Sequence, residues 1–184
     1  MKRLFDLLVS LAAIICALPI LLITAVAIKL DSKGGVLFKQ ARIGLNGKHF
    51  SIYKFRSMVI GAARSGPYFT EANDRRITRV GAFIRRTSLD ELPQILNVLQ
   101  GDMSIVGPRP NVPEQEKEYA NNQWVKRNSV KPGITGLAQA TLRSQATPEQ
   151  RTALDLEYVD KNSMGMDLRI ILMTVKQILS KGGN

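Results

Sequence analysis

An almost unbroken apolar run near the N-terminal end constrains this chain more than any other feature. Residues 4–30 contain few polar positions, and the run is longer than the roughly 20 residues that a helix needs to cross a bilayer. Lys2 and Arg3 precede it, as in a secretory signal. However, the run is too long for the apolar core of a cleaved signal, and no small-x-small site clearly closes it. The sequence therefore predicts a retained membrane element.

The topology of this element is open from the residues alone. Pro19 lies near its middle, where a proline removes a backbone hydrogen bond and kinks a helix. Basic residues flank both ends, so the positive-inside rule gives no through-going orientation. These residues are Lys2, Arg3, Lys29 and Lys33. A kinked spanning helix and a hairpin that dips into one leaflet fit these features equally well.

The charge balance points to an anionic partner. Among 184 residues, 26 are Lys or Arg and 15 are acidic, which gives a formal net charge of +11. Such an excess suits nucleic acid, an acidic membrane surface or a phosphorylated substrate. The single cysteine, Cys16, and the single histidine, His49, disfavour a disulfide framework, a Cys/His zinc site and a Ser/His/Asp triad. If the protein is an enzyme, carboxylates and cations must carry its chemistry.

Beyond residue 31 the sequence predicts short strands, loops and helices, and a mainly helical α+β fold. In chain order we expect strands at 36–38 and 50–55 around a turn at 44–47, a surface loop at 61–78, an amphipathic segment at 80–86, a helix at 92–99 stopped by Gly101, a rigid loop at 107–110, a polar helix at 113–124, a loop at 131–136, and helices near 148–162 and 166–180. The last helix has a broad apolar face with basic neighbours, which suits either core packing or a membrane interface.

Two adjacent carboxylates, Asp90 and Glu91, follow a pair of arginines and open a predicted helix. Ser88 and Glu91 have the spacing of a capping box, in which Glu91 reaches back to the Ser88 amide. The same helix start would attract phosphate and keep a nearby carboxylate ionised. An ionised aspartate there can attack phosphorus, while its neighbour helps to bind magnesium or to handle a proton. The capping and catalytic interpretations are compatible.

Arg109 lies between Pro108 and Pro110. Because the backbone has little freedom there, the guanidinium could be aimed at phosphate oxygens with little ordering cost. The plainer alternative is a surface arginine in a turn. The sequence contains neither a G-x-x-x-x-G-K-[ST] loop nor a G-x-G-x-x-G motif, so an ATPase or a dinucleotide enzyme lacks support.

Several longer segments occur in a fixed order along the chain. They are Phe38-Lys39-Gln40-Ala41-Arg42-x-Gly44, Tyr53-Lys54-Phe55-Arg56-Ser57-Met58, Ser88-Leu89-Asp90-Glu91-Leu92-Pro93-Gln94, Gly101-Asp102-Met103-Ser104-Ile105-Val106-Gly107-Pro108-Arg109-Pro110 and Lys131-Pro132-Gly133-Ile134-Thr135-Gly136-Leu137-Ala138-Gln139. Together they resemble the bacterial sugar transferase family, the monotopic phosphoglycosyl transferases. The resemblance extends from the membrane segment to Asp167 and Leu168, in the minimal form without extra transmembrane helices.

The resemblance implies a re-entrant membrane helix over residues 1–30, kinked at Pro19. It also implies a cytosolic catalytic domain over residues 31–184, with amphipathic interface helices and a short β-hairpin, on the cytoplasmic face of the bacterial inner membrane. One departure concerns the kink. The family commonly has a Ser-Pro pair there, whereas this chain has Leu18-Pro19, so the serine hydroxyl that could satisfy a freed carbonyl is absent.

The resemblance also implies a reaction. Asp90 and Glu91 match the family's catalytic dyad, and Mg²⁺, or Mn²⁺, is expected at the same two carboxylates. The substrates are expected to be a UDP-sugar and undecaprenyl phosphate. We predict a ping-pong transfer in which Asp90 attacks the β-phosphorus, UMP leaves, and the polyprenyl phosphate takes the phosphosugar in the first membrane step of glycoconjugate assembly. The cations expected to bind phosphate are Arg109, Arg86, Lys54 and Arg56.

Two other functional classes remain as alternatives. A basic nucleic-acid-binding protein held at the membrane would explain the net charge, but the cations are dispersed instead of concentrated in one tract or recognition helix. We therefore expect no nucleic-acid partner. A non-catalytic scaffold for glycan assembly is disfavoured by the intact pair of Asp90 and Glu91.

Overall fold

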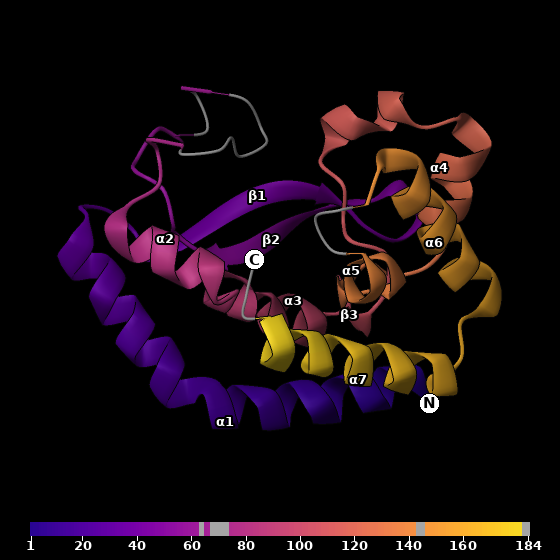
Figure 1. Cartoon of the computed structure of the whole chain (residues 1–184), viewed down its shortest axis with the longest axis horizontal. Coiled ribbons are helices and arrows are strands. Elements are labelled where there is room, and N and C mark those ends of the chain that lie inside the picture. The colour runs from indigo at the N-terminus through magenta and orange to yellow at the C-terminus, as the bar shows by residue number, and fades with distance from the viewer. Residues whose placement is uncertain (63–64, 67–73, 143–145, 182–184) are drawn as a thin grey trace.

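The computed structural model describes residues 1–62, 65–66, 74–142 and 146–181, and Figure 1 shows how their elements are arranged. In chain order these are α1 (Lys2–Asp31), β1 (Leu37–Ile43), the 3₁₀ turn η1 (Leu45–Gly47), β2 (His49–Phe55), α2 (Arg79–Arg86), the 3₁₀ helix η3 (Leu89–Gln94), α3 (Ile95–Gln100), β3 (Ser104–Val106), the 3₁₀ helix η4 (Pro113–Glu118), α4 (Asn121–Arg127), β4 (Gly133–Thr135), α5 (Leu137–Thr141), α6 (Pro148–Lys161) and α7 (Met164–Lys181). The predominance of helix, with a long apolar first helix and a two-stranded hairpin, confirms that part of the predicted fold class.

Helix α1 is the dominant element of the molecule. It contains Pro19 and has four buried residues, namely Asp6, Ser10, Thr24 and Ile28. Figure 1 shows that the helix bends and runs along one side of the remaining structure. Most of its large apolar side chains are exposed to the surroundings. By length and composition, α1 is the one helix among the described residues that could cross a membrane.

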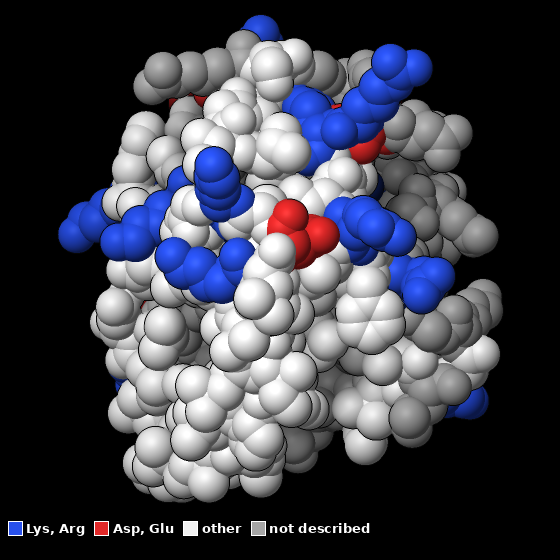
Figure 2. Space-filling model, turned by 90° about the vertical axis from the view of Figure 1, so that its left-hand side faces the viewer, with Lys and Arg blue, Asp and Glu red and all other residues white. Residues whose placement is uncertain are grey.

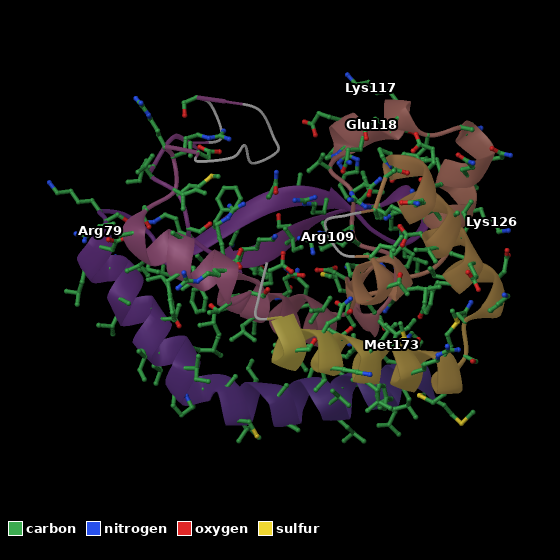
Figure 3. The ribbon with its side chains drawn as sticks, in the orientation of Figure 1. Arg79, Arg109, Lys117, Glu118, Lys126 and Met173 are labelled. Carbon is green, nitrogen blue, oxygen red and sulfur yellow. The ribbon has the colours of Figure 1, made fainter. Side chains whose placement is uncertain are left out.

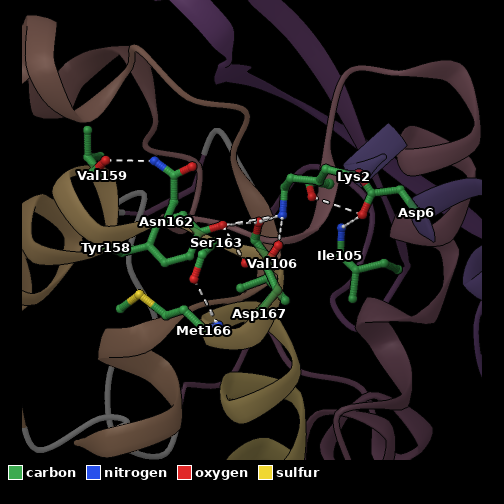
Figure 4. Close-up of polar contacts among 11 residues, drawn as sticks. Lys2, Asp6, Ile105, Val106, Tyr158, Val159, Asn162, Ser163, Met166 and Asp167 are labelled. Carbon is green, nitrogen blue, oxygen red and sulfur yellow. Dashed lines mark hydrogen bonds and ion pairs between the residues drawn. The ribbon is translucent and has the colours of Figure 1, made fainter. Parts of the chain in front are cut away.

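The first two turns of α1 are bound to the rest of the chain by polar contacts (Figure 4). The Lys2 ammonium contacts the Asp167 carboxylate and donates to the carbonyl of Val106 at 3.2 Å. One turn later, Asp6 accepts a hydrogen bond from the Ser104 hydroxyl at 3.0 Å. Asp6 is 2% exposed, so its charge is removed from the surroundings by these contacts. This end of α1 is therefore fixed on β3 and α7.

The last turn of α1 is bound in a comparable way. The carboxylate of Asp31 accepts a hydrogen bond from the backbone amide of Val80, in α2, at 3.0 Å. Directly after the helix, the Arg56 guanidinium donates to the carbonyl of Ser32 at 2.7 Å and to that of Lys33 at 2.6 Å. Both ends of α1 are consequently attached to the same body of protein.

The exposed surface near the end of α1 divides into a charged part and an uncharged part. Figure 2 shows Lys and Arg side chains gathered across the upper half of this side, above a lower half that is almost entirely uncharged. Exposed basic residues on the last turn of α1, on the segment after it and on α2 are Lys29, Lys33, Arg79 and Arg86. A boundary of this kind is the pattern of a protein surface that meets anionic headgroups above hydrocarbon.

The predicted hairpin is confirmed, and β1 is longer than the strand expected at 36–38. β1 and β2 pair antiparallel over seven residues, from Leu37 opposite Phe55 to Ile43 opposite His49. Within the turn, Asn46 adopts φ 55°, a left-handed conformation that asparagine tolerates better than most residues. One face of β2 contributes Ile52 to a core cluster that includes residues of α3 and the following loop.

A second, parallel pair of strands joins two loops that lie far apart in the sequence. Ser104 is opposite Gly133 and Val106 is opposite Thr135. Residues 131–136 were expected to form a loop, so the strand β4 corrects that prediction. The pairing requires glycine, because a Cβ on Gly133 would lie 2.1 Å from the backbone nitrogen of Gly107. Strands of three residues have no hydrophobic period by which the sequence could reveal them.

Two further predictions change in detail, and a third lies partly outside the described residues. The helix expected at 92–99 is divided into η3 and α3, and Gly101 ends α3 with φ 94°, as a left-handed C-terminal glycine does. The single polar helix expected at 113–124 is wrong. Tyr119 is extended between η4 and α4, and its ring packs against Trp124 with the centroids 5.4 Å apart. Of the loop expected at 61–78, residues 63–64 and 67–73 lie outside the described residues.

Helices α6 and α7 confirm the two helices that were expected to close the chain. Ile170 of α7 is fully buried and joins a core cluster with Val106, Ala140 and Tyr158. The opposite side of α7 exposes Leu168, Leu172, Val175 and Ile178. One helix therefore combines a core-packed face with an exposed apolar face, and its first turn contacts the first turn of α1 through the ion pair of Lys2 and Asp167.

Candidate functional site

Asp90 and Glu91 lie on η3, between α2 and α3. The expected capping box is wrong. Ser88 adopts φ 57°, and its side chain makes no capping hydrogen bond. The Glu91 carboxylate turns instead toward two cations, with which it gains more than with a single backbone amide. Pro93 lies inside this 3₁₀ helix, where it interrupts the donor pattern that an α-helix would need.

Glu91 is held between Arg109 and Lys54. The Arg109 guanidinium donates to both carboxylate oxygens, with 3.2 Å between Nη1 and Oε2. Lys54, on β2, donates to Oε1 at 2.7 Å. The exposed fractions of the three side chains are 19% for Glu91, 16% for Lys54 and 41% for Arg109. Figure 3 marks the place of Arg109 among the side chains. The structure thus brings together three residues that the sequence singled out separately.

The charges of this cluster determine its ionisation. Burial alone would raise the pKa of Glu91, but the charges of Arg109 and Lys54 outweigh it and hold that pKa far below its usual value. Burial lowers the pKa of Lys54, and the carboxylate of Glu91 opposes this shift. The charge of Glu91 raises the pKa of Arg109. The ionised form of Glu91 is therefore stabilised by the two cations that contact it.

Asp90 is in a different environment from its neighbour. It is 9% exposed, and within the described part of the chain its carboxylate has no hydrogen-bond or ion-pair partner. Burial raises the pKa of Asp90, as does the negative charge of Glu91, while Lys54, Arg85 and Arg109 oppose the shift. A carboxylate that is desolvated and unpaired beside three cations has its oxygen atoms available for an incoming group.

Two of the predicted phosphate-binding residues are placed elsewhere. The Arg56 guanidinium is bonded to the segment directly after α1, as described above. Arg86 is exposed on α2, and its guanidinium lies 6.0 Å from the centre of the Phe83 ring. Their assignment to phosphate stays a prediction, although the structure does not bring either of them into the cluster around Glu91.

Two arginines that the sequence analysis did not select lie closer to the carboxylates. The charge of Arg85 opposes the rise in the pKa of Asp90 that burial causes. Arg42, on β1, is affected by the charges of both Arg109 and Glu91, and burial lowers its pKa to about 10. The hairpin register could have revealed Arg42. It lies four residues from Phe38, the cross-strand partner of Lys54, and therefore on the same face of the sheet.

The two carboxylates suit a magnesium ion only if a substrate supplies further ligands to it. Among the described residues no group of three or more His, Cys, Asp and Glu side chains gathers in one place. Glu91 already accepts from Arg109 and Lys54, whereas Asp90 keeps an open carboxylate. Mg²⁺ in proteins is commonly held by one or two carboxylates together with substrate phosphates. The residues present suit an ion that arrives with a phosphorylated substrate and contacts Asp90.

Comparison with known proteins gives a consistent result. The model of the family described as "Bacterial sugar transferase" matches residues 1–181. The chain is 44% identical to "Undecaprenyl-phosphate glucose phosphotransferase" from Komagataeibacter xylinus, across 96% of this chain and 35% of that protein. It is 44% identical to "UDP-glucose:undecaprenyl-phosphate glucose-1-phosphate transferase" from Xanthomonas campestris pv. campestris, across 98% and 39%. It is 47% identical to "Exopolysaccharide production protein PSS" from Rhizobium leguminosarum bv. phaseoli, across 99% and 96%. The chain thus spans little more than a third of the first two relatives and nearly all of the third.

Proposed function

The chain belongs to the bacterial sugar transferase family, and on that premise we propose that it transfers a phosphosugar from a UDP-sugar to undecaprenyl phosphate in the bacterial cytoplasmic membrane. The observation that carries this proposal is the contrast between two adjacent carboxylates. Glu91 is occupied by Arg109 and Lys54, whereas Asp90 is desolvated and open. The names of the relatives from Komagataeibacter and Xanthomonas support the choice of substrates.

The proposed reaction has two steps, both at phosphorus. An oxygen of Asp90 attacks the β-phosphorus of the UDP-sugar, and the bond from that phosphorus to the bridging oxygen breaks as UMP leaves. The phosphosugar is then joined to Asp90 as an acyl phosphate. An oxygen of the lipid phosphate attacks the same phosphorus, and Asp90 leaves as a carboxylate. The product is undecaprenyl diphosphosugar, and the free enzyme is restored without any change of oxidation state.

The cations of the cluster supply the electrostatic part of the mechanism. Arg109 is 41% exposed although Glu91 binds it, so part of its guanidinium can reach phosphate oxygens. In this proposal the charges of Lys54 and Arg109 offset the negative charge that develops on the transferred group. A bound magnesium or manganese ion, held by Asp90 and, in the sequence prediction, by Glu91, would neutralise the diphosphate and stabilise the UMP leaving group.

The attachment of α1 supports a re-entrant arrangement. A helix of 30 residues is about 45 Å long if straight, enough to cross a bilayer. If it crossed, its two ends would lie on opposite faces of the membrane. Instead, Lys2 and Asp31 are both bonded to the same body of protein. We attribute the bend of α1 to Pro19, which lacks an amide donor and crowds the preceding turn.

In this proposed arrangement the catalytic residues would lie at the membrane surface. The exposed apolar side chains of α1 and α7 would enter one leaflet, while the basic residues near the end of α1 would meet anionic headgroups. Because UDP-sugars are cytosolic, this surface is assigned to the cytoplasmic face. A lipid phosphate would then approach the site without leaving the headgroup layer.

The decisive experiment measures UMP. The full chain, purified in detergent or nanodiscs, is incubated with undecaprenyl phosphate, Mg²⁺ and a panel of UDP-sugars. We expect release of UMP and formation of a lipid diphosphosugar with at least one sugar, and none with Asp90→Asn. Absence of UMP with every UDP-sugar from a folded, membrane-bound chain would reject the proposed function.

A further inference from the structure

The backbone of the loop that presents Arg109 is held by two other arginines. The carbonyl of Arg109 accepts a hydrogen bond from Nη2 of Arg127 at 2.7 Å. The next carbonyl, that of Pro110, accepts from Nη1 of Arg42 at 3.0 Å. On the other side of the loop, the amide of Gly107 donates to the carbonyl of Thr135 at 2.9 Å. The loop is therefore anchored to three elements, β1, α4 and β4.

Arg127 is itself fixed by a buried ion pair between α4 and α6. Its Nε donates to Asp155 at 2.9 Å, and its Nη2 lies 2.7 Å from the same carboxylate oxygen. Both side chains are 1% exposed. Burial raises the pKa of Asp155, and the charge of Arg127 opposes this shift. The guanidinium also lies 5.6 Å from the centre of the Tyr119 ring. These contacts hold Arg127 beside the loop.

Stability alone does not account for this pair. Taking two charges out of water is costly, and a buried pair is often no more stabilising than apolar residues of similar volume. What apolar residues could not do is donate a hydrogen bond to the carbonyl of Arg109. We propose that Arg127, held by Asp155, is a positioning residue that fixes the backbone of Arg109, so that the Arg109 guanidinium stays in reach of Glu91 and of the substrate phosphate. This inference rests on the proposed function for the role of Arg109.

The position of the hydrogen bond is what makes it effective. The ring of Pro110 already restricts the preceding residue to extended backbone angles. The orientation of the Arg109 carbonyl depends on the remaining backbone rotation at Arg109, and the hydrogen bond from Arg127 sets that rotation. Misplacement of a catalytic group by about 1 Å can cost on the order of 10²-fold in rate. A change at Arg127, which touches neither Glu91 nor Asp90 in the structure, should therefore reach the reaction through Arg109.

The chain offers a matched control. Lys126 and Asp160 form an ion pair between the same two helices, with 2.7 Å between their charged atoms. This pair is exposed, and Figure 3 shows Lys126 on the outer side of the molecule, away from Arg109. Asp160→Asn therefore removes an α4–α6 ion pair without touching the loop. Its expected effect on turnover is none.

Two variants of the buried pair are compared with the parent chain. Asp155→Asn keeps the volume but removes the charge that holds Arg127. Arg127→Met combined with Asp155→Leu replaces the pair by apolar side chains and avoids a buried unpaired charge, so that folding is retained. Arg109→Lys is added to the parent and to this double variant. We expect the double variant to lose about 10- to 100-fold in kcat, with a melting temperature close to that of the parent.

The combination with Arg109→Lys separates positioning from structural support. If Arg127 acts through Arg109, the Arg109→Lys substitution costs much less in the double variant than in the parent, because the side chain is already displaced. If the pair only supports the fold, the two losses multiply. Multiplying losses, or full turnover in the double variant, would overturn the inference.

A readout independent of turnover keeps this test distinct from the test of function. Amide hydrogen exchange of the full chain is followed by mass spectrometry in peptides that cover residues 107–112. We expect faster exchange there in Asp155→Asn and in the double variant, and unchanged exchange in Asp160→Asn. If the parent chain released no UMP, the proposed function would be rejected. If amide exchange at residues 107–112 were unchanged in Asp155→Asn and in the double variant, the proposed positioning of the loop by Arg127 would be rejected.

Discussion

Removal of the Glu91 charge by Glu91→Gln should lower stability strongly, because this carboxylate is the common partner of two cations. The substitution removes the ion-pair partner of Lys54, which is 16% exposed, and deprives Arg109 of its paired contact. Breaking a buried ion pair from one side typically costs 3–5 kcal/mol. Arg109 is 41% exposed and can be rehydrated, so we expect the lower end, about 3 kcal/mol.

This loss is measurable as a shift in thermal unfolding. For a chain of this size, 1 kcal/mol corresponds to about 2–4 °C, so the melting temperature should fall by about 6–12 °C. The control is Glu157→Gln, which removes the exposed pair between Glu157 and Lys161. An exposed pair of that kind contributes about 0.3–0.5 kcal/mol. Equal shifts in the two variants would refute the interpretation of Glu91 as a buried counter-ion.

The pH dependence of the same variant provides a second test. The folded state holds the pKa of Glu91 below its ordinary value of 4.5. Its stabilising contribution is therefore complete above that ordinary pKa and is lost as the pH falls through the lower folded-state pKa. The difference in melting temperature between the parent and Glu91→Gln should be full at neutral pH and should shrink below about pH 4.5. A difference that grew on acidification would contradict the cited shift.

The remaining predictions concern catalysis and topology. Asp90→Asn should abolish UMP release, and comparable UMP release would reject Asp90 as the nucleophile. The same variant should have a higher melting temperature, because burial and the charge of Glu91 raise the pKa of Asp90 and make its ionised form costly to the folded state above the ordinary pKa. Arg109→Lys should lower kcat/KM by about 10- to 100-fold through loss of the planar fork, and unchanged kinetics would make Arg109 a loop residue only. Exhaustive chelation should stop UMP release and Mg²⁺ or Mn²⁺ should restore it, whereas full activity after chelation would exclude a metal. In a Cys16→Ser background, single cysteines ahead of residue 1 and at Lys33 should both be shielded from an impermeant thiol reagent in intact cells, and labelling of the first would show a spanning helix.

The elements that could be predicted are those with a long run of continuous or periodic apolar residues, or with a strong local turn signal. Helices α1, α6 and α7 were expected from continuous or periodic apolar residues, and the hairpin from two strand-like runs around a glycine turn. The parallel pair β3–β4 could not be predicted, because each strand has three residues and its partner is about thirty residues away. Its signal is the pair of glycines whose missing side chains let the two backbones approach.

The same distinction applies to the site. Asp90, Glu91 and Arg109 stand in conspicuous local sequence, and Lys54 lies in a recognisable strand. For Arg56 and Arg86, the sequence does not tell on which side of a strand or helix the guanidinium lies. Arg56 is bonded to the segment after α1 instead. The role of Arg127 could not be predicted, because it depends on a contact with a residue eighteen positions away.

The N-terminal end of α1 has a consequence for how the membrane and the site are connected. Asp6 accepts from the Ser104 hydroxyl and from the amide of Ile105, and β3 leads within three residues to the loop that carries Arg109. A carboxylate at the start of an apolar helix would be costly in hydrocarbon, but here it is buried in protein and hydrogen-bonded. In the proposed arrangement the first turns of α1 therefore also lie against the catalytic core, and the part around Pro19 enters the leaflet without such polar contacts. The depth of that part is then set by β3, so the distance from the headgroup layer to Arg109 is fixed by the fold instead of by a flexible linker.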